Sequence, residues 1–160
     1  MSLSQHDLPF LQQAIALATE NVQTGKGGPF AAIITKNGAV IATGSNVVTA
    51  TNDPSAHAEV SAIREACRVL NRFQLDGCTL YASCEPCPMC LGAIYWARID
   101  RLVFAAGKEQ AQEAGFDDAF IYKEMELPYH QRHLETVQIS LPQDNGPFER
   151  WVNSDTKTDY

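Results

Sequence analysis

Residues 84–90, Cys84-Glu85-Pro86-Cys87-Pro88-Met89-Cys90, hold three of the five cysteines of this 160-residue chain. An odd and crowded set differs from the even, spread cysteines of a disulfide framework, and it is typical of a metal site in a reducing compartment. Proline suits the first position of a helix. Pro88 therefore predicts a helix that begins there, with Cys87 at its cap and Cys90 in its first turn.

The spacing of Cys87 and Cys90 places both thiols on one face of that helix. The partial positive charge of a helix N-terminus favours thiolates, the form that binds zinc. A lone Cys-x-x-Cys also fits a redox pair or half of a structural zinc site. Cys84 is a possible fourth ligand, and His57, at the entry of another expected helix, is the better third. With three protein ligands, zinc keeps an open position for water, as catalytic zinc sites do.

A carboxylate accompanies the histidine in the sequence His57-Ala58-Glu59. A carboxylate beside zinc-activated water can take up its proton and return it to a substrate. Two residues on a regular helix lie about 200° apart. Glu59 and His57 can therefore border one site only if His57 occupies the irregular start of the helix.

Outward from these motifs, helical and strand-like segments alternate. Apolar residues recur at helical spacing over 8–23, and two apolar runs flank the hairpin signal Asn37-Gly38. The expected helices cover 8–23, 56–70, 88–97, 116–125 and 148–153, and the expected strands cover 30–36, 40–46, 78–83, 101–105 and 136–141. The strand over 101–105 follows a strand–helix unit, so it is expected to run parallel to the strand before it. This order predicts a single α/β domain over 1–160 with helices packed on a mixed sheet.

The charge of the chain narrows the classes of partner. The net charge is −7 and the isoelectric point is near 5.0, which is a poor match for phosphate backbones. The stripe formed by Arg64, Arg68 and Arg72 has acidic neighbours and is interpreted as a solvated helix face. We find no apolar run of the roughly 20 residues that span a bilayer. Nor does the N-terminus have the pattern of a signal peptide, so a cytoplasmic protein is expected.

The pairing of His57-x-Glu59 with Pro86-Cys87-x-x-Cys90 resembles the zinc signature of the cytidine deaminase superfamily. Within it, the chain is similar to the bacterial guanine deaminases over nearly its whole length. The stretches that carry this likeness are Gly27-Gly28-Pro29-Phe30, the Asn46 segment, 52–59, 84–98, Ala114-Gly115-Phe116-Asp117-Asp118 and the terminal Tyr160. The resemblance implies a three-layer αβα fold with a central mixed five-stranded sheet, which forms one zinc-dependent nucleobase deaminase domain.

The resemblance also assigns roles to individual residues. It implies one zinc ion per subunit, held by His57, Cys87 and Cys90, with Glu59 as the proton carrier. The implied substrate contacts are Phe30 and Trp96 around the ring, Asn46 as a hydrogen-bond partner, Asp118 at the departing amino group and Tyr160 closing over the base. It further implies a homodimer that exchanges C-terminal segments between subunits. On composition alone, Phe30 and Trp96 would fit a core, and Tyr160 would fit a frayed chain end.

The expected reaction is the hydrolytic deamination of guanine to xanthine and ammonia, with no nucleic acid or membrane partner. Glu59 and Asp118 are both candidates for delivery of the second proton. Two alternatives stay open at this stage. One is a deaminase of another base, such as cytosine or adenosine in transfer RNA. The other is a non-catalytic zinc module, which would have four protein ligands and no accessible water.

Overall fold

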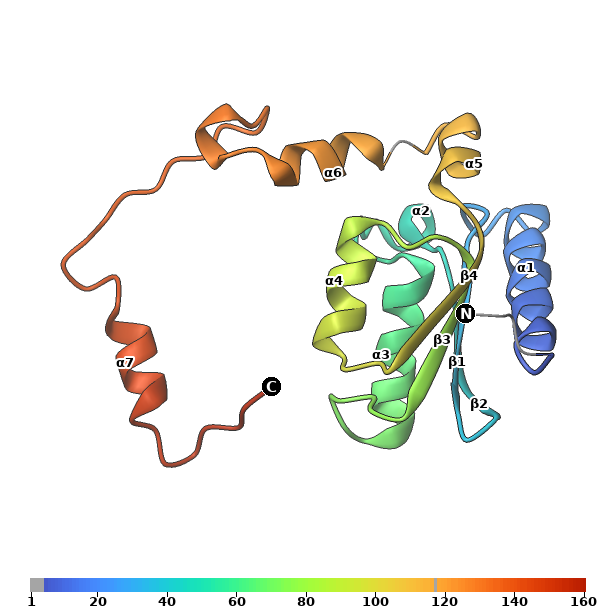
Figure 1. The fold of residues 1–160 in the computed structure, drawn as a ribbon, viewed down its shortest axis with the longest axis horizontal. Coiled ribbons are helices and arrows are strands. Elements are labelled where there is room, and N and C mark those ends of the chain that lie inside the picture. Colours follow the sequence, from blue (N-terminus) through green and yellow to red (C-terminus); the bar gives the residue numbers. More distant parts are fainter. Residues whose placement is uncertain (1–4, 117) are drawn as a thin grey trace. The chain divides into compact units, whose positions relative to one another are not determined.

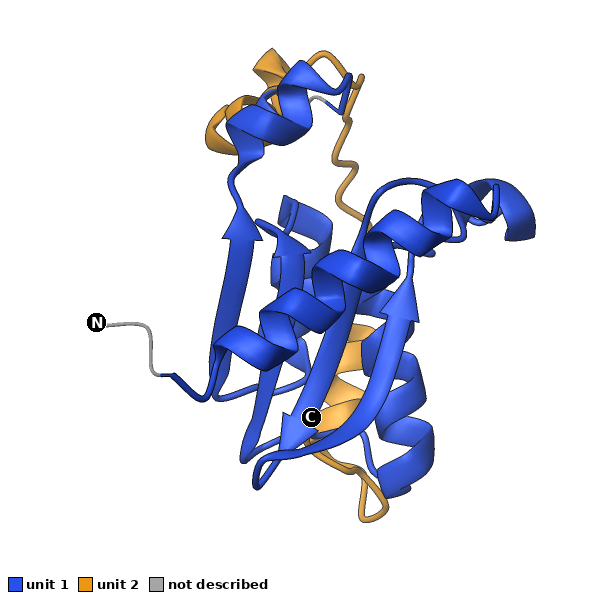
Figure 2. Ribbon diagram, turned by 90° about the vertical axis from the view of Figure 1, so that its right-hand side faces the viewer, with its two compact units in different colours: residues 1–119 blue, residues 120–160 orange. Residues whose placement is uncertain are grey.

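The computed structural model describes residues 5–116 and 118–160. The chain divides into two compact units, residues 1–119 and residues 120–160, and Figure 2 shows them in different colours. The β-sheet and the helices that pack on it all belong to the first unit. The candidate metal ligands belong to this unit as well, so the fold that positions them can be described within residues 1–119.

A four-stranded mixed sheet forms the centre of the first unit. Its strands are β1 (Ala31–Lys36), β2 (Ala39–Ser45), β3 (Cys78–Cys84) and β4 (Arg101–Ala106), in the spatial order β2-β1-β3-β4. β1 is antiparallel to β2 and β3, whereas β3 and β4 are parallel, as the crossover rule predicts. The predicted hairpin turn is confirmed, because Asn37 and Gly38 have φ angles of 52° and 77°, which suit a tight turn between twisted strands.

Helices cover both faces of this sheet. α1 (Leu8–Gln23) lies on one side, and α3 (Ala58–Leu70) and α4 (Pro88–Trp96) lie on the other, as Figure 1 shows. Alternate strand residues serve the two layers, because successive side chains of a strand point to opposite faces. Ile33 packs in the cluster with α1, and its neighbour Ile34 packs in the cluster on the α3 and α4 side. The three-layer α/β/α arrangement is therefore confirmed.

Small residues bring α3 unusually close to the sheet. A Cβ atom on Gly44 of β2 would lie 2.3 Å from the carbonyl oxygen of Ala58 and 2.4 Å from the amide nitrogen of Ala62. Both alanines are fully buried. This close packing fixes the start of α3 against the end of β2. The start of α3 is where His57 and Glu59 are found.

The start of α1 is held to the sheet by an ion pair in which Asp7 is buried and Arg101 is partly exposed. Asp7 accepts hydrogen bonds from the Arg101 guanidinium at 2.6 and 2.7 Å and from the Tyr81 hydroxyl at 2.9 Å. Burial and the hydrogen bond to Asp7 raise the pKa of the Tyr81 phenol. The start of α1 is thereby joined to the middle of β3 and to β4.

The fifth strand predicted over 136–141 is wrong for the single chain, because the sheet of the described residues has four strands. Val137 and Ile139 alternate as strand residues do, but a strand also needs a neighbour for its backbone hydrogen bonds. Two short helices escaped prediction, α2 (Val48–Thr51) and α5 (Lys108–Glu113). The remaining elements are α6 (Ala119–Glu126), the 3₁₀ turn η1 (Tyr129–Gln131) and α7 (Gly146–Val152). Among the described residues, no helix has both the length and the apolar character to cross a membrane.

Candidate metal centre and active site

Two helix starts bring the three predicted zinc ligands together. His57 caps α3 in an extended conformation, with φ −69° and ψ 161°, and Cys87 caps α4 with φ −65° and ψ 168°. Cys90 follows in the first turn of α4 and is fully buried. The Nδ1 atom of His57 lies 3.6 Å from the Sγ atom of each cysteine. In the part of the chain that the structure describes, this is the group of histidine, cysteine and acidic side chains that could hold a metal ion.

The donor distances can be compared with those that zinc requires. A tetrahedral site with zinc–nitrogen bonds of about 2.0 Å and zinc–sulfur bonds of about 2.3 Å separates a nitrogen and a sulfur ligand by about 3.5 Å. The two nitrogen–sulfur distances of the cluster, each 3.6 Å, lie close to this value. One imidazole and two thiols therefore fit a zinc ion, and a fourth position is left for a non-protein ligand.

The electrostatics of the two cysteines differ, and only those of Cys87 favour the thiolate form. A hydrogen bond from the Cys90 thiol and a second one from His57 lower the pKa of Cys87 to about 4. The pKa of Cys90 is raised, because its thiol donates to Cys87 and is buried. The hydrogen bond with Cys87 raises the pKa of His57. Cys87 is therefore a thiolate at neutral pH, as a zinc ligand must be.

Glu59 lies beside this cluster in the first turn of α3 and is 8% exposed. Burial raises the pKa of its carboxyl group, while a hydrogen bond from its own backbone amide opposes that shift. Because His57 stands just before the helix in an extended conformation, the two side chains can border the same cavity. The position predicted for His57, at the irregular start of a helix, is confirmed.

A cavity of about 480 Å³ opens above the donor cluster. Six of the residues singled out from the sequence line it, namely Phe30, Asn46, His57, Glu59, Cys87 and Asp118. They come from the segment before β1, the end of β2, the starts of α3 and α4, and the segment after α5. The ring of Phe30 meets the ring of Phe116 edge-on, with 4.8 Å between the centroids.

Trp96 lies outside the lining of this cavity and Cys84 lies outside the donor cluster, while Tyr160 is described within its own unit. Trp96 is the last residue of α4, is 62% exposed and does not line this cavity. Tyr160 belongs to the unit 120–160, where its ring lies 6.3 Å from that of Trp151. The Cys84 thiol donates to the Gly107 carbonyl at 3.6 Å and is not part of the donor cluster. The substrate roles of Trp96 and Tyr160 stay predictions.

The cavity is also lined by residues to which the sequence analysis assigned no role. Val48 and Thr49 line it from α2, Glu85 lines it from the segment between β3 and α4, and Phe116 lines it from the segment after α5. Glu85 accepts a hydrogen bond from the backbone amide of Lys108 at 3.2 Å, at the start of α5. The position of Glu85 directly after Cys84 in the metal motif is the sequence signal that could have indicated it as a cavity residue. The two short helices gave no periodic pattern from which their residues could be placed.

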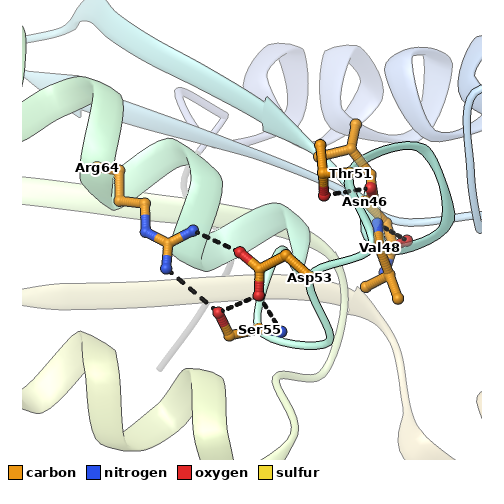
Figure 3. A network of polar contacts seen from close by, with 7 residues as sticks. Asn46, Val48, Thr51, Asp53, Ser55 and Arg64 are labelled. Atoms are coloured by element: carbon orange, nitrogen blue, oxygen red, sulfur yellow. Dashed lines mark hydrogen bonds and ion pairs between the residues drawn. The ribbon is translucent and has the colours of Figure 1, made fainter.

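A polar network fixes the turn that leads into His57, as Figure 3 shows. Asp53 accepts hydrogen bonds from the backbone amide of Ser55 at 2.8 Å and from its hydroxyl at 2.6 Å. Arg64, on α3, reaches Asp53 at 3.4 Å and the Ser55 hydroxyl at 3.2 Å. The bonds from Ser55 hold the pKa of Asp53 below its usual value. The turn is thereby tied to the helix that begins after His57.

Comparison with known proteins agrees with this geometry. Residues 4–106 match the family model of the cytidine and deoxycytidylate deaminase zinc-binding region, which is more than half of the chain. The chain belongs to this family of zinc-binding deaminases. It is 56% identical over 151 residues to the guanine deaminase of Bacillus subtilis, which covers 94% of this chain and 97% of that protein.

Solved structures and a second relative extend the comparison. The crystal structure of Bacillus subtilis guanine deaminase matches with a TM-score of 0.94 and 53% identity over 99% of both chains. A guanine deaminase from Nitrosomonas europaea matches with a TM-score of 0.66 and 33% identity, over 74% of this chain and 67% of that chain. A transfer-RNA-specific adenosine deaminase of Aquifex aeolicus is 44% identical over 61% of this chain and 64% of that protein.

Proposed function

We propose that this chain is a zinc-dependent guanine deaminase that hydrolyses guanine to xanthine and ammonia. The observation that carries the proposal is the likeness to the guanine deaminase of Bacillus subtilis, which covers 94% of this chain and 97% of that protein. The adenosine deaminase of Aquifex aeolicus covers only 61% of this chain. Guanine is therefore the better-supported substrate, because the likeness to a guanine deaminase extends over almost the whole chain.

The chemistry of the cavity supports a hydrolytic reaction. A zinc ion held by His57, Cys87 and Cys90 would supply a water molecule whose pKa is lowered towards neutrality. Glu59 would take a proton from the attacking water and pass it to the ring nitrogen beside the reacting C2 carbon. The amino group then leaves as ammonia after a second proton reaches it, from either Glu59 or Asp118. The balance of the reaction is guanine plus water to xanthine plus ammonia.

The walls of the cavity suit a flat base with polar edges. Phe30 offers a ring face or edge, and Asn46 offers an amide that is only 8% exposed. Trp96 and Tyr160, which are implied by the resemblance, would complete the enclosure of the base. The zinc ligands serve every base deaminase of the family equally well, so they do not distinguish guanine from another base. These substrate contacts make that distinction.

We also propose that two copies form a homodimer by exchanging their C-terminal segments. In the first unit, β4 is an edge strand with an outward Phe104 that is 43% exposed. In the second unit, Val137 is 71% exposed and Ile139 is 74% exposed. An edge strand presents unpaired backbone groups, and an alternating apolar segment is typical of a strand that completes an edge. The segment 136–141 of one copy would thus supply the strand that the single chain lacks.

The five cysteines are free thiols, which is typical of a reducing compartment. This supports the cytoplasmic location that the sequence predicts.

The experiment that tests the function measures ammonia release and zinc content together. The purified chain is given guanine, adenine, cytosine and a transfer RNA, each at the same concentration. We expect about one zinc ion per chain and release from guanine at least about a hundredfold faster than from the other compounds, because a site that hydrogen-bonds its substrate rejects analogues strongly. Release from the transfer RNA would favour the alternative deaminase. Zinc without release from any compound would favour a non-catalytic module.

Removal of residues 157–160 tests the role of the chain end. We expect guanine turnover to fall about tenfold or more while zinc content and melting temperature stay unchanged, because a closing side chain acts by positioning the base. The measurements are steady-state kinetics and thermal unfolding. Tyr160→Phe is the matched control, which keeps the ring and loses the hydroxyl. Wild-type kinetics in the truncated chain would mean that the last residues are only a chain end.

A further inference from the structure

Asn21 lies near the end of α1 and is 3% exposed. It does not line the cavity. Its Nδ2 atom donates one hydrogen bond to the carbonyl oxygen of Gly28 and another to the carbonyl oxygen of Asn46, each at 2.8 Å. One amide group thus joins two backbone segments that are far apart in the sequence. One is the loop before β1, and the other is the end of β2.

These two segments carry the cavity residues Phe30 and Asn46. The amide of Asn46 donates to the carbonyl of Phe30 at 3.0 Å, and the amide of Phe30 donates to the carbonyl of Gly28 at 2.8 Å. The approach is so close that a Cβ atom on Gly27 would lie 2.0 Å from the Asn46 oxygen. The Asn21 amide therefore lies where the two walls of the cavity meet.

We infer that Asn21 is a positioning residue that sets the spacing between Phe30 and Asn46 and thereby the affinity of the cavity for its base. The inference rests on the proposed function in one respect, namely that the cavity takes a purine. A side-chain amide suits this place because it has two N–H donors on one planar group. Buried carbonyl groups need such donors, and a carbonyl left without one loses free energy.

The helix gives Asn21 a rigid support. Leu11 and Ala14 of α1 are buried against Ile33 and Tyr81 of the sheet. The backbone carbonyl of Asn21 also accepts the amide of Lys26 at 3.1 Å, which orders the loop that follows the helix. A fixed helix and a bidentate side chain together hold the loop and the strand end in one arrangement.

Asn21 should affect binding rather than the chemical step. The Asn21 amide donates to the backbone at Gly28 and Asn46, whereas the zinc ligands and Glu59 lie at the starts of α3 and α4 and are not its hydrogen-bond partners. Asn46, in contrast, is held by it directly. Its side-chain oxygen accepts a hydrogen bond from the backbone amide of Val48 at 3.4 Å. A shift of the Asn46 backbone would therefore move this side chain and change that hydrogen bond.

The test replaces Asn21 by Leu, which removes both donors at similar volume, and by Asp, which sets carboxylate oxygens against the two carbonyl groups. We expect the KM for guanine to rise about fivefold for Asn21→Leu, and further for Asn21→Asp, from the loss of two buried hydrogen bonds. The kcat should stay within about twofold and the zinc content should stay unchanged, since Asn21 acts on the walls that bind the base and not on the metal site. Asn21→Gln keeps both donors on a longer stem and should recover part of the affinity.

Backbone hydrogen exchange gives a readout that does not depend on turnover. The amides of Phe30 and of residues 46–48, which are hydrogen-bonded in the structure, should exchange at least about tenfold faster in Asn21→Leu, while the amides of β3 keep their protection. Asp7→Asn is the matched control, because it weakens the opposite end of the same helix at the Arg101 ion pair. This control should lower the melting temperature and leave the KM unchanged.

Several results would overturn the inference. One is unchanged exchange over both segments in Asn21→Leu. Another is an equal rise of KM in Asp7→Asn, which would assign the effect to the docking of α1 as a whole. If the wild-type chain releases no ammonia from guanine, the proposed function fails. Hydrogen exchange then decides the role of Asn21 by itself, because faster exchange confined to the two segments supports the inference and unchanged exchange removes it.

Discussion

Glu59→Gln is expected to bind zinc as the wild type does and to lose about 10²- to 10⁴-fold in kcat, the usual contribution of a general acid–base group. Glutamine has nearly the same shape, but its amide cannot take a proton from water at neutral pH. Glu59 is 8% exposed and lies beside the donor cluster without being one of its ligands. Its loss should therefore remove proton transfer and leave the metal in place.

The measurement combines ammonia release with zinc content by atomic absorption. Glu65→Gln is the matched control, because Glu65 lies on the same helix and pairs with the solvent-exposed Arg68. An ion pair in that position contributes little to stability, so this variant should turn over as the wild type does. A Glu59→Gln chain that keeps more than a few per cent of the turnover would mean that another residue, with Asp118 as the first candidate, carries the proton.

The metal half of the site could be predicted from the sequence because its causes are local. Pro88 determines where α4 begins, and this places Cys87 at the cap and Cys90 one turn later. His57 stands at the cap of α3 for a similar reason, directly after a turn with its own side-chain hydrogen bonds. Each of these positions depends on residues fewer than about six places away, which is the range over which turn and capping rules apply.

The structural features that the sequence did not predict correctly depend on residues that are far apart in the chain. The alternation over 136–141 has the pattern of a strand, but a strand also needs a pairing partner, and the sheet of the described residues is made of β1 to β4. Asn21 has the position of an ordinary polar residue late in a helix. Its two partners lie 7 and 25 residues further along the chain, so its role becomes visible only when the loop and the end of β2 are folded against α1.

The residues that line the cavity could be predicted from the sequence only in part. The resemblance pointed to Phe30, Asn46 and Asp118, and the structure brings all three to one cavity with the zinc ligands. Val48 and Thr49 line the same cavity, but they could not be chosen in advance, because α2 is too short for a helical pattern to emerge from a few residues. A base-binding site built from five separate segments is thus a product of topology, whereas the metal cluster is largely a product of two helix starts.

Cys90→Ala is expected to lower zinc affinity by more than about a hundredfold, since even the loss of a group that only supports a zinc ligand costs about 10- to 100-fold. Guanine turnover should be lost with the metal. The thiol of Cys90 is fully buried at 3.6 Å from His57, and no other donor of the cluster can replace it. Zinc content after dialysis against a weak chelator and a competitive titration of the metal measure the effect. Cys67→Ala removes a thiol from α3 outside the cluster and should bind zinc normally.

The pH dependence of zinc binding provides a second check on the same ligand. Zinc binds the thiolate and the neutral imidazole, so protons compete with the metal for both kinds of ligand. The pKa of Cys90 lies above its usual range and that of His57 is also raised, and zinc must therefore displace protons at neutral pH. The affinity of the wild-type chain should fall as the pH falls, and in Cys90→Ala the dependence should be shallower, because one competing proton is gone. An equally steep dependence in both chains would mean that Cys90 is not a ligand.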